Sequence, residues 1–214
     1  MRIDRVIIRA ALSTLGAIAV LLVVMVSALS IAFPQTMMKL SYDMGMDKLS
    51  VQFAARAYET SGKAYYVAYA TEVAIGADDY ANVETYGELL VKDDEFADYC
   101  KERDVVVEEN GAFQEISYAQ YIYGEICVAK YLLGNTQQAL QSAWEYIGNG
   151  TSFVKNNAMV ALLLEMLGQK DLAAVQTVLG KMNEIEQSAL VDDTQRTYLS
   201  QLISATQNWT AKNS

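Results

Sequence analysis

The chain has 214 residues and carries 16 basic and 26 acidic side chains, which gives a net charge of −10 at pH 7. One proline and 12 glycines argue against collagen-like, disordered and most all-β chains. The absence of histidine excludes imidazole catalysis, histidine-bound zinc and a histidine-ligated haem, and the acidic excess argues against nucleic-acid binding. We therefore expect no metal, no cofactor and no nucleic-acid partner.

The segment from Ala10 to Phe33 contains no charged residue. As a helix with a rise of about 1.5 Å per residue it would reach roughly 36 Å, which exceeds the ~30 Å hydrocarbon core of a bilayer. The only proline, Pro34, follows at once and favours an end to the helix. The predicted divisions are a short cytoplasmic N-terminus (1–9), a single transmembrane helix (10–33) and a linker (34–46).

Two alternatives to a membrane anchor remain open. A cleaved signal peptide could end near Ala28-Leu29-Ser30, although its apolar core would be long, and the segment could instead be a buried helix of a soluble domain. Three arginines precede the span, whereas the lysines after it are dispersed. The positive-inside rule therefore favours a cytoplasmic N-terminus and an extracytoplasmic C-terminal domain.

The rest of the chain shows the periodicity of an all-α protein. Apolar residues recur at steps of three and four, as on one face of a helix. The clearest run is Ala119, Ile122, Ile126, Ala129 and Leu133. Val105–Val107 is the one strand-like patch, and it is short. We place an insertion near it, from Val105 to Phe113.

A 34-residue period links two of the predicted helical hairpins. Leu133-Gly134 recurs as Leu167-Gly168, and Ala139 recurs as Ala173. Period, turn glycine and second-helix alanine together resemble the tetratricopeptide-repeat family, whose units are helix–turn–helix hairpins. The usual tryptophan position holds Tyr123 and Asn157 instead, and the closing proline is missing.

The resemblance extends more weakly toward the N-terminus, where the spacing predicts a helix turn at Gly62. It implies about four hairpins stacked as an α-solenoid, because one hairpin cannot bury its own apolar face. The predicted divisions are helical repeats over 47–182 and a C-terminal capping helix within 183–214, expected from Asp192 to about Trp209.

Tyrosine is abundant, with 14 residues, and the resemblance implies partner binding in the concave groove of the solenoid. At helical spacing tyrosines are more often half-buried packing residues, but they are also favoured at binding hot spots. Our candidates for the groove are Tyr65, Tyr69, Tyr121 and Asn157. The position of Asn157 usually packs inside in this family, so it is the weakest of the four.

The negative charge is concentrated between Thr71 and Glu115, where 14 acidic residues face 3 basic ones. A solvated face that keeps the domain soluble is the favoured explanation of such a cluster, and a docking surface for a basic partner is the alternative. Calcium binding is disfavoured, because the cluster lacks the alternating ligands and central glycine of an EF-hand loop. The candidate docking residues are Asp93, Asp94 and Asp98.

The two cysteines, Cys100 and Cys127, lie in helical apolar patterns, which favours free buried thiols and leaves a disulfide open. No P-loop, dinucleotide fingerprint or zinc-protease motif is present. We therefore expect a non-enzymatic, membrane-anchored helical-repeat adaptor that binds a protein or peptide at the extracytoplasmic face. The alternatives are a structural subunit of a larger membrane assembly and, less favoured, a cell-envelope enzyme.

Overall fold

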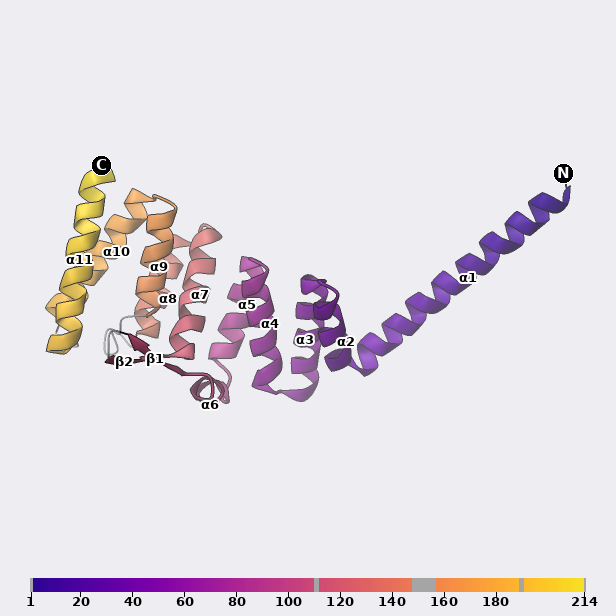
Figure 1. Ribbon diagram of the computed structural model, residues 1–214, viewed down its shortest axis with the longest axis horizontal. Helices are drawn as coiled ribbons and strands as arrows, with labels where there is room; N and C mark the ends of the chain where they lie inside the picture. The colour runs from indigo at the N-terminus through magenta and orange to yellow at the C-terminus, as the bar shows by residue number, and fades with distance from the viewer. Residues whose placement is uncertain (1, 110–111, 148–156, 189–190, 214) are drawn as a thin grey trace. The chain divides into compact units, whose positions relative to one another are not determined.

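The computed structural model describes residues 2–109, 112–147, 157–188 and 191–213. Within these ranges the chain forms eleven helices and one β-hairpin, which confirms the expected all-α class (Figure 1). The chain divides into two compact units, Met1–Gly62 and Lys63–Ser214.

The first unit contains three helices, α1 (Arg2–Ala32), α2 (Pro34–Asp43) and α3 (Asp47–Ser61). The stretch Leu12–Ala32 of α1 is almost entirely exposed, and it is long and apolar enough to cross a membrane or to act as a signal sequence. The helix ends where Pro34 was expected to end it.

The segment predicted as a linker, 34–46, instead contains α2. Pro34 occupies the first position of this helix, where its missing N–H costs nothing and its fixed φ favours helix formation. Helix α2 packs on α3 through Pro34 and Met38, and the Ser50 hydroxyl donates a hydrogen bond to the Met38 carbonyl at 2.9 Å. Proline therefore ends one helix and begins the next.

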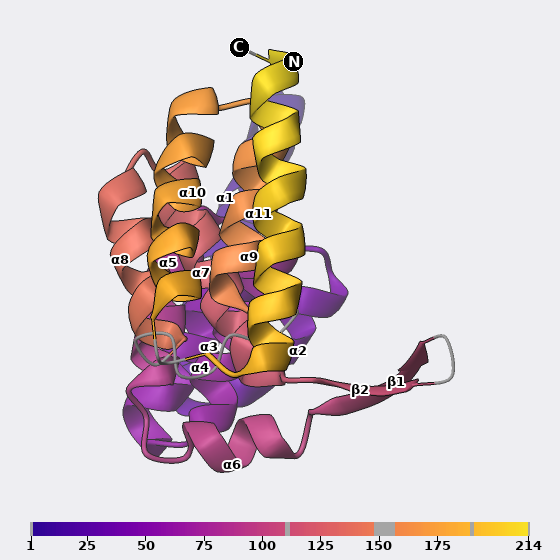
Figure 2. The same ribbon diagram turned by 90° about the vertical axis from the view of Figure 1, so that its left-hand side faces the viewer.

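The second unit holds the remaining elements of the described chain. Helices α4, α5 and α6 come first, followed by the antiparallel strands β1 and β2, which pair from Val105↔Ile116 to Glu109↔Ala112. Helices α7 to α11 complete the unit, and Figure 2 shows the hairpin projecting away from them. The bounds are α4 (Ala64–Gly76), α5 (Tyr80–Val91), α6 (Phe96–Lys101), β1 (Val105–Glu109), β2 (Ala112–Ile116), α7 (Tyr118–Leu132), α8 (Thr136–Tyr146), α9 (Ala158–Gly168), α10 (Leu172–Gln187) and α11 (Asp193–Asn213).

Helix pairing agrees with the sequence in one part of the chain and differs in another. Helices α7 and α8, on either side of Gly134, pack together. Helix α9, which ends at Gly168, likewise packs on the following helix, α10. On either side of Gly62 the main helix contacts are those of α3 with α2 and of α4 with α5, which differ from the predicted pairing of α3 with α4. Gly62, in the left-handed region at φ 67°, caps α3 at the boundary between the units.

Close helix packing around α7 depends on two glycines. A Cβ on Gly124 would lie 2.9 Å from the Ala161 Cβ of α9, and one on Gly87 of α5 would lie 2.6 Å from the Ile126 side chain. Small residues therefore let α7 approach α9 and α5 closely. From Cys127 onward the buried apolar side chains of α7 to α11 form one continuous core.

A buried lysine ties α5, α7 and α8 together. Lys130 on α7 is only 5% exposed, and its Nζ lies 2.6 Å from a carboxylate oxygen of Glu88 on α5. The same ammonium donates a hydrogen bond to the Ser142 hydroxyl on α8 at 2.7 Å. The hydrogen bond from Lys130 lowers the pKa of Glu88 although burial opposes it.

Replacing Lys130 by methionine should destabilise the protein by about 1–3 kcal/mol, because Glu88 and Ser142 then lose a buried charged partner. The measurement is urea unfolding of the detergent-solubilised chain, followed by circular dichroism. Lys92→Met is the matched control, since Lys92 pairs with the same Glu88 carboxylate but is exposed.

The pH dependence of this difference has a definite sign. A lowered pKa of Glu88 stabilises the folded state above the ordinary value of 4.5, and this contribution is lost as the pH falls through the folded-state pKa. The effect of Lys130→Met should therefore shrink below pH 4.5. Equal effects of Lys130→Met and Lys92→Met at pH 7 would contradict the role of the buried pair.

Candidate partner-binding surface

Five tyrosines from α4, α6 and α7 gather around Glu72 on the second unit. The rings of Tyr99 and Tyr118 are 6.1 Å apart, and those of Tyr118 and Tyr121 are 5.9 Å apart. Tyr65 and Tyr69, one turn apart on α4, have ring centroids at 6.4 Å. We call this group the tyrosine surface: Tyr65, Tyr69, Glu72, Tyr99, Tyr118 and Tyr121.

Glu72 links the three helices of the tyrosine surface. Its carboxylate on α4 accepts hydrogen bonds from the hydroxyls of Tyr99 on α6, at 3.4 Å, and of Tyr118 on α7. Burial and the neighbouring Glu72 charge raise the pKa of both phenols far above their ordinary value. Both tyrosines therefore stay neutral hydrogen-bond donors at any physiological pH.

Arg103 and Asp104 lie between the end of α6 and the first strand of the hairpin, β1. The Arg103 guanidinium lies 3.6 Å from the centre of the Tyr99 ring and donates a hydrogen bond to the Tyr99 carbonyl at 3.1 Å. The Asp104 carboxylate accepts the backbone N–H of Tyr118 at 2.8 Å. The base of the hairpin insertion therefore fixes the start of α7, and with it the ring of Tyr118.

Carboxylates continue this surface beyond Tyr121. Glu125, one turn along α7, is more than half buried, and burial raises the pKa of its side chain. The charges of Glu165 on α9 and Asp78 after α4 raise the Glu125 pKa further. Burial raises the pKa of Tyr80, and the charges of Asp78 and Glu165 raise it further. Tyr80, Asp78, Glu125 and Glu165 therefore share one electrostatic environment. This acidic region attracts cations.

Three of the predicted groove residues lie on the tyrosine surface. Tyr65 and Tyr121 are exposed and Tyr69 is half buried. The sequence pattern missed Tyr99, Tyr118 and Glu72 as site residues. Tyr118 could have been found from its spacing of three from Tyr121, whereas nothing local marks Glu72 or Tyr99, because their partners are distant in sequence.

Asn157 is a structural residue, and its assignment to the groove is wrong. Its side chain is 1% exposed, and Oδ1 accepts the backbone N–H of Val160 at 3.0 Å as the N-cap of α9. Asparagine is among the best N-cap residues because its short side chain reaches the free amides of the first turn. A partner has no access to this group.

The acidic patch of Asp93, Asp94 and Asp98, before and within the first turn of α6, is only partly exposed. Asp94 and Asp98 are exposed, whereas Asp93 is half buried and accepts the backbone N–H of Glu95 at 2.9 Å. Glu95 in turn accepts the backbone N–H of Ala64 at the start of α4, at 3.2 Å. Part of the charge therefore organises a turn. Among the described residues no group of acidic or cysteine side chains is arranged to hold a metal ion.

Cys100 on α6 and Cys127 on α7 are both free and buried. Burial raises the pKa of each thiol to about 12. At neutral pH both are protonated, so they act as small apolar side chains rather than as nucleophiles.

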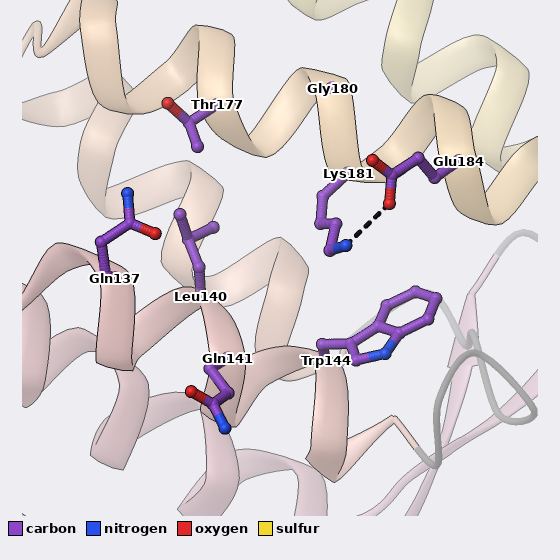
Figure 3. Close-up of a pocket in the computed structure, with 8 residues that line it drawn as sticks. All are labelled: Gln137, Leu140, Gln141, Trp144, Thr177, Gly180, Lys181 and Glu184. Carbon is purple, nitrogen blue, oxygen red and sulfur yellow. Dashed lines mark hydrogen bonds and ion pairs between the residues drawn. The ribbon is translucent and has the colours of Figure 1, made fainter.

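A hollow of about 480 Å³ lies between α8 and α10, apart from the tyrosine surface (Figure 3). Trp144 forms one wall, and the Lys181 ammonium lies 5.2 Å from the centre of its ring. Lys181 also pairs with Glu184 at 2.7 Å, as the dashed line in Figure 3 marks. The two opposite charges in this hollow compensate each other, so it lacks the charge bias that Glu125 and its neighbours give the tyrosine surface.

Comparison with protein families, curated proteins and solved structures gives no match to this chain. The assignment of function therefore depends on the geometry of the chain itself.

Glu125→Gln should raise the thermal unfolding midpoint at pH 7 by a few degrees at most. A raised carboxyl pKa means that the folded state disfavours the charged form, and the amide removes this penalty together with the repulsion from Glu165 and Asp78. The gain should disappear below pH 4.5, where Glu125 is protonated in both states. Glu102→Gln, at an exposed position, is the control. A lower midpoint for Glu125→Gln at pH 7 would overturn this account.

Asn157→Ala should destabilise the second unit by about 1 kcal/mol through the loss of the α9 cap. Asn157→Ser keeps a capping oxygen and should lose much less. Urea unfolding checks both variants, and neither should alter partner binding. If both variants bound a partner more weakly at unchanged stability, Asn157 would return to the site.

Proposed function

We propose that the chain is a membrane-anchored helical-repeat adaptor whose second unit binds a basic protein or peptide segment at the extracytoplasmic face. The single observation that carries this proposal is the tyrosine surface, where tyrosine rings from three helices, two of them exposed, adjoin Glu125 and Glu165. Neither of these carboxylates has an ion-pair partner among the described residues. The proposal has three parts: the anchor, the repeat architecture and the surface.

The anchor is α1. Its stretch Leu12–Ala32 has the length and composition of a membrane span and is almost entirely exposed, so it lacks the cover that a core helix would have. Arg2, Arg5 and Arg9 precede this stretch on the same helix. Their concentration supports a cytoplasmic N-terminus, which leaves the second unit on the opposite side.

The repeat architecture is the tetratricopeptide-like stacking that the 34-residue period predicts. Helix α7 packs on both α8 and α9, and α8 also contacts α9. First helices that pack on one another while second helices cover them are the arrangement that such repeats use. In that arrangement α4, α7 and α9 are the first helices, although α7 packs mainly on α5 rather than on α4. These three helices carry Tyr65, Glu72, Tyr121, Glu125 and Glu165.

The surface suits a chain that carries lysine or arginine. Tyrosine rings offer a large contact area with few rotatable bonds, and their faces attract cations. The charge of Glu165 raises the pKa of Glu125, so a bound cation would relieve the repulsion that Glu125 experiences. Because the outer charges are solvated, we expect affinity to fall as salt rises.

The test is photo-crosslinking in the native host with a benzophenone amino acid at position 121, and at Gln201 on the exposed side of α11 as control. The crosslinked peptide at position 121 should be rich in lysine and arginine and absent at 201. Against that peptide, Tyr65→Ala/Tyr121→Ala should weaken binding at least about tenfold, as expected for loss of two aromatic contacts. Helicity should not change.

The matched variant Tyr65→Phe/Tyr121→Phe keeps both rings and should retain most of the affinity. Undiminished binding by the double-alanine variant would reject the tyrosine surface. A structural subunit is distinguished by exchanging residues 10–32 of α1 for an unrelated span. An adaptor should keep its partner after that exchange, whereas a subunit assembled through its span should lose it.

A further inference from the structure

Helix α2 exposes an apolar stripe that nothing in the first unit covers. Phe33, Leu40 and Met44 are 58%, 48% and 62% exposed, and Met37 is half buried. At 3.6 residues per turn, positions 37, 40 and 44 lie within about 60° of one another around the helix axis, and Phe33, the N-cap residue, precedes Met37 by about one turn. We call these four residues the α2 stripe.

The α2 stripe is distinct from the face that α2 packs on α3. The packed face carries Pro34, Met38 and Ser41, all of them buried. A third face carries Gln35, Lys39 and Asp43, all exposed and polar. Helix α2 therefore has one face packed on α3, a second, apolar face that the described residues of the first unit leave exposed, and one polar face for water.

The chain itself limits how far the α2 stripe can be from a bilayer. The apolar stretch of α1 ends at Ala32, and Phe33 is the next residue, so their Cα atoms are about 3.8 Å apart. Met44, the last stripe residue, follows Phe33 by about 16 Å of helix at most. The chain also changes direction between α1 and α2 (Figure 1), so α2 does not continue along the axis of the span.

Polar side chains of α3 mark the level at which the apolar stretch ends. A hollow of about 420 Å³ at the end of α1 is lined by residues of both helices. From α3 it takes Arg56, Glu59 and Thr60, and from the last turns of α1 it takes Ser27 and Ser30. Charged groups such as Arg56 and Glu59 avoid hydrocarbon, so this level corresponds to lipid headgroups. Phe33 follows within one turn of it.

We propose that α2 is an interfacial helix whose stripe enters the boundary between the headgroups and acyl chains of the bilayer that α1 spans. Two further exposed apolar residues, Met46 and Leu49, extend the apolar surface into the turn and the start of α3. Lys39 and Lys48 are exposed on the same segment and suit anionic headgroups. This inference rests on the proposed role of α1 as an anchor.

The test places nitroxide spin labels on the full chain in lipid nanodiscs of phosphatidylcholine and phosphatidylglycerol. Cys100 and Cys127 are first replaced by alanine, and unchanged helicity is required. Labels at Leu40→Cys and Met44→Cys report on the stripe, and labels at Lys39→Cys and Asp43→Cys, each one residue earlier, are matched controls. A label at Val20→Cys, in the middle of α1, reports on the anchor independently.

The measurement compares collisions with oxygen, which concentrates in lipid, and with a water-soluble nickel chelate. The oxygen-to-nickel ratio should be at least about threefold higher at 40 and 44 than at 39 and 43, because the stripe alone faces acyl chains. Val20 should give the highest ratio of all.

Each other outcome overturns the inference in a distinguishable way. If Val20 lies in lipid but all four α2 labels are equally open to nickel, the anchor stands and the interfacial helix is rejected. If labels 40 and 44 are shielded from both reagents, or broaden one another between chains, a protein covers the stripe instead of lipid. If Val20 itself is open to nickel, the anchor fails, and the interfacial role fails with it.

Discussion

The close packing of α7 against its neighbours is the constraint on which the second unit depends. Gly124 lets α7 approach Ala161 of α9, and Gly87 of α5 leaves room for Ile126. Lys130 on the same helix is then buried next to Glu88 and Ser142, so its charge is compensated at the point where three helices meet. Fixing α7 in this way also fixes Tyr118, Tyr121 and Glu125, which it carries toward the outside.

Lys130 and Glu125 are charged residues of α7 that are both largely buried, but their surroundings differ. Lys130 has an anion at 2.6 Å and a hydroxyl at 2.7 Å, so its charge is compensated where it is buried. Glu125 has other acids as its neighbours, so its burial costs stability. Glu125 lies one turn from the exposed ring of Tyr121, and a carboxylate beside an aromatic ring suits the binding of a basic partner. The expected stability gain of Glu125→Gln measures the folding free energy that the chain loses by keeping this charge.

Local chemistry predicted those features that depend on neighbouring residues. The steps of three and four from Ala119 to Leu133 predicted α7, the glycine at 134 predicted the turn to α8, and Pro34 predicted the end of α1. The helix from 34 to 43 was missed, because a proline that ends one helix is equally suited to the first turn of the next. The hairpin was seen only as an insertion, because Val105–Val107 is too short to show alternation.

Features that depend on tertiary contacts could not be predicted from the sequence. Apolar periodicity shows which face of a helix is buried but not which helix covers it, so α4 was paired with α3 rather than α5. Glu72 meets Tyr99 and Tyr118 only because α4, α6 and α7 come together, across 27 and 46 residues of chain. Asn157 was predicted to line the groove from its position in the repeat, but in the structure its side chain caps the N-terminus of α9.

The exposed character of the tyrosine surface sets an expectation for its affinity. Solvated ion pairs at such a surface contribute little each, so a peptide held by Tyr65, Tyr121 and a few carboxylates would bind weakly from free solution. An anchor changes this, because two partners held at one membrane meet at an effective concentration far above their bulk concentration. Weak, salt-sensitive contacts then suffice for occupancy while still permitting rapid release. On this argument the proposed anchor supplies the local concentration, and the tyrosine surface has only to supply selectivity for a basic partner.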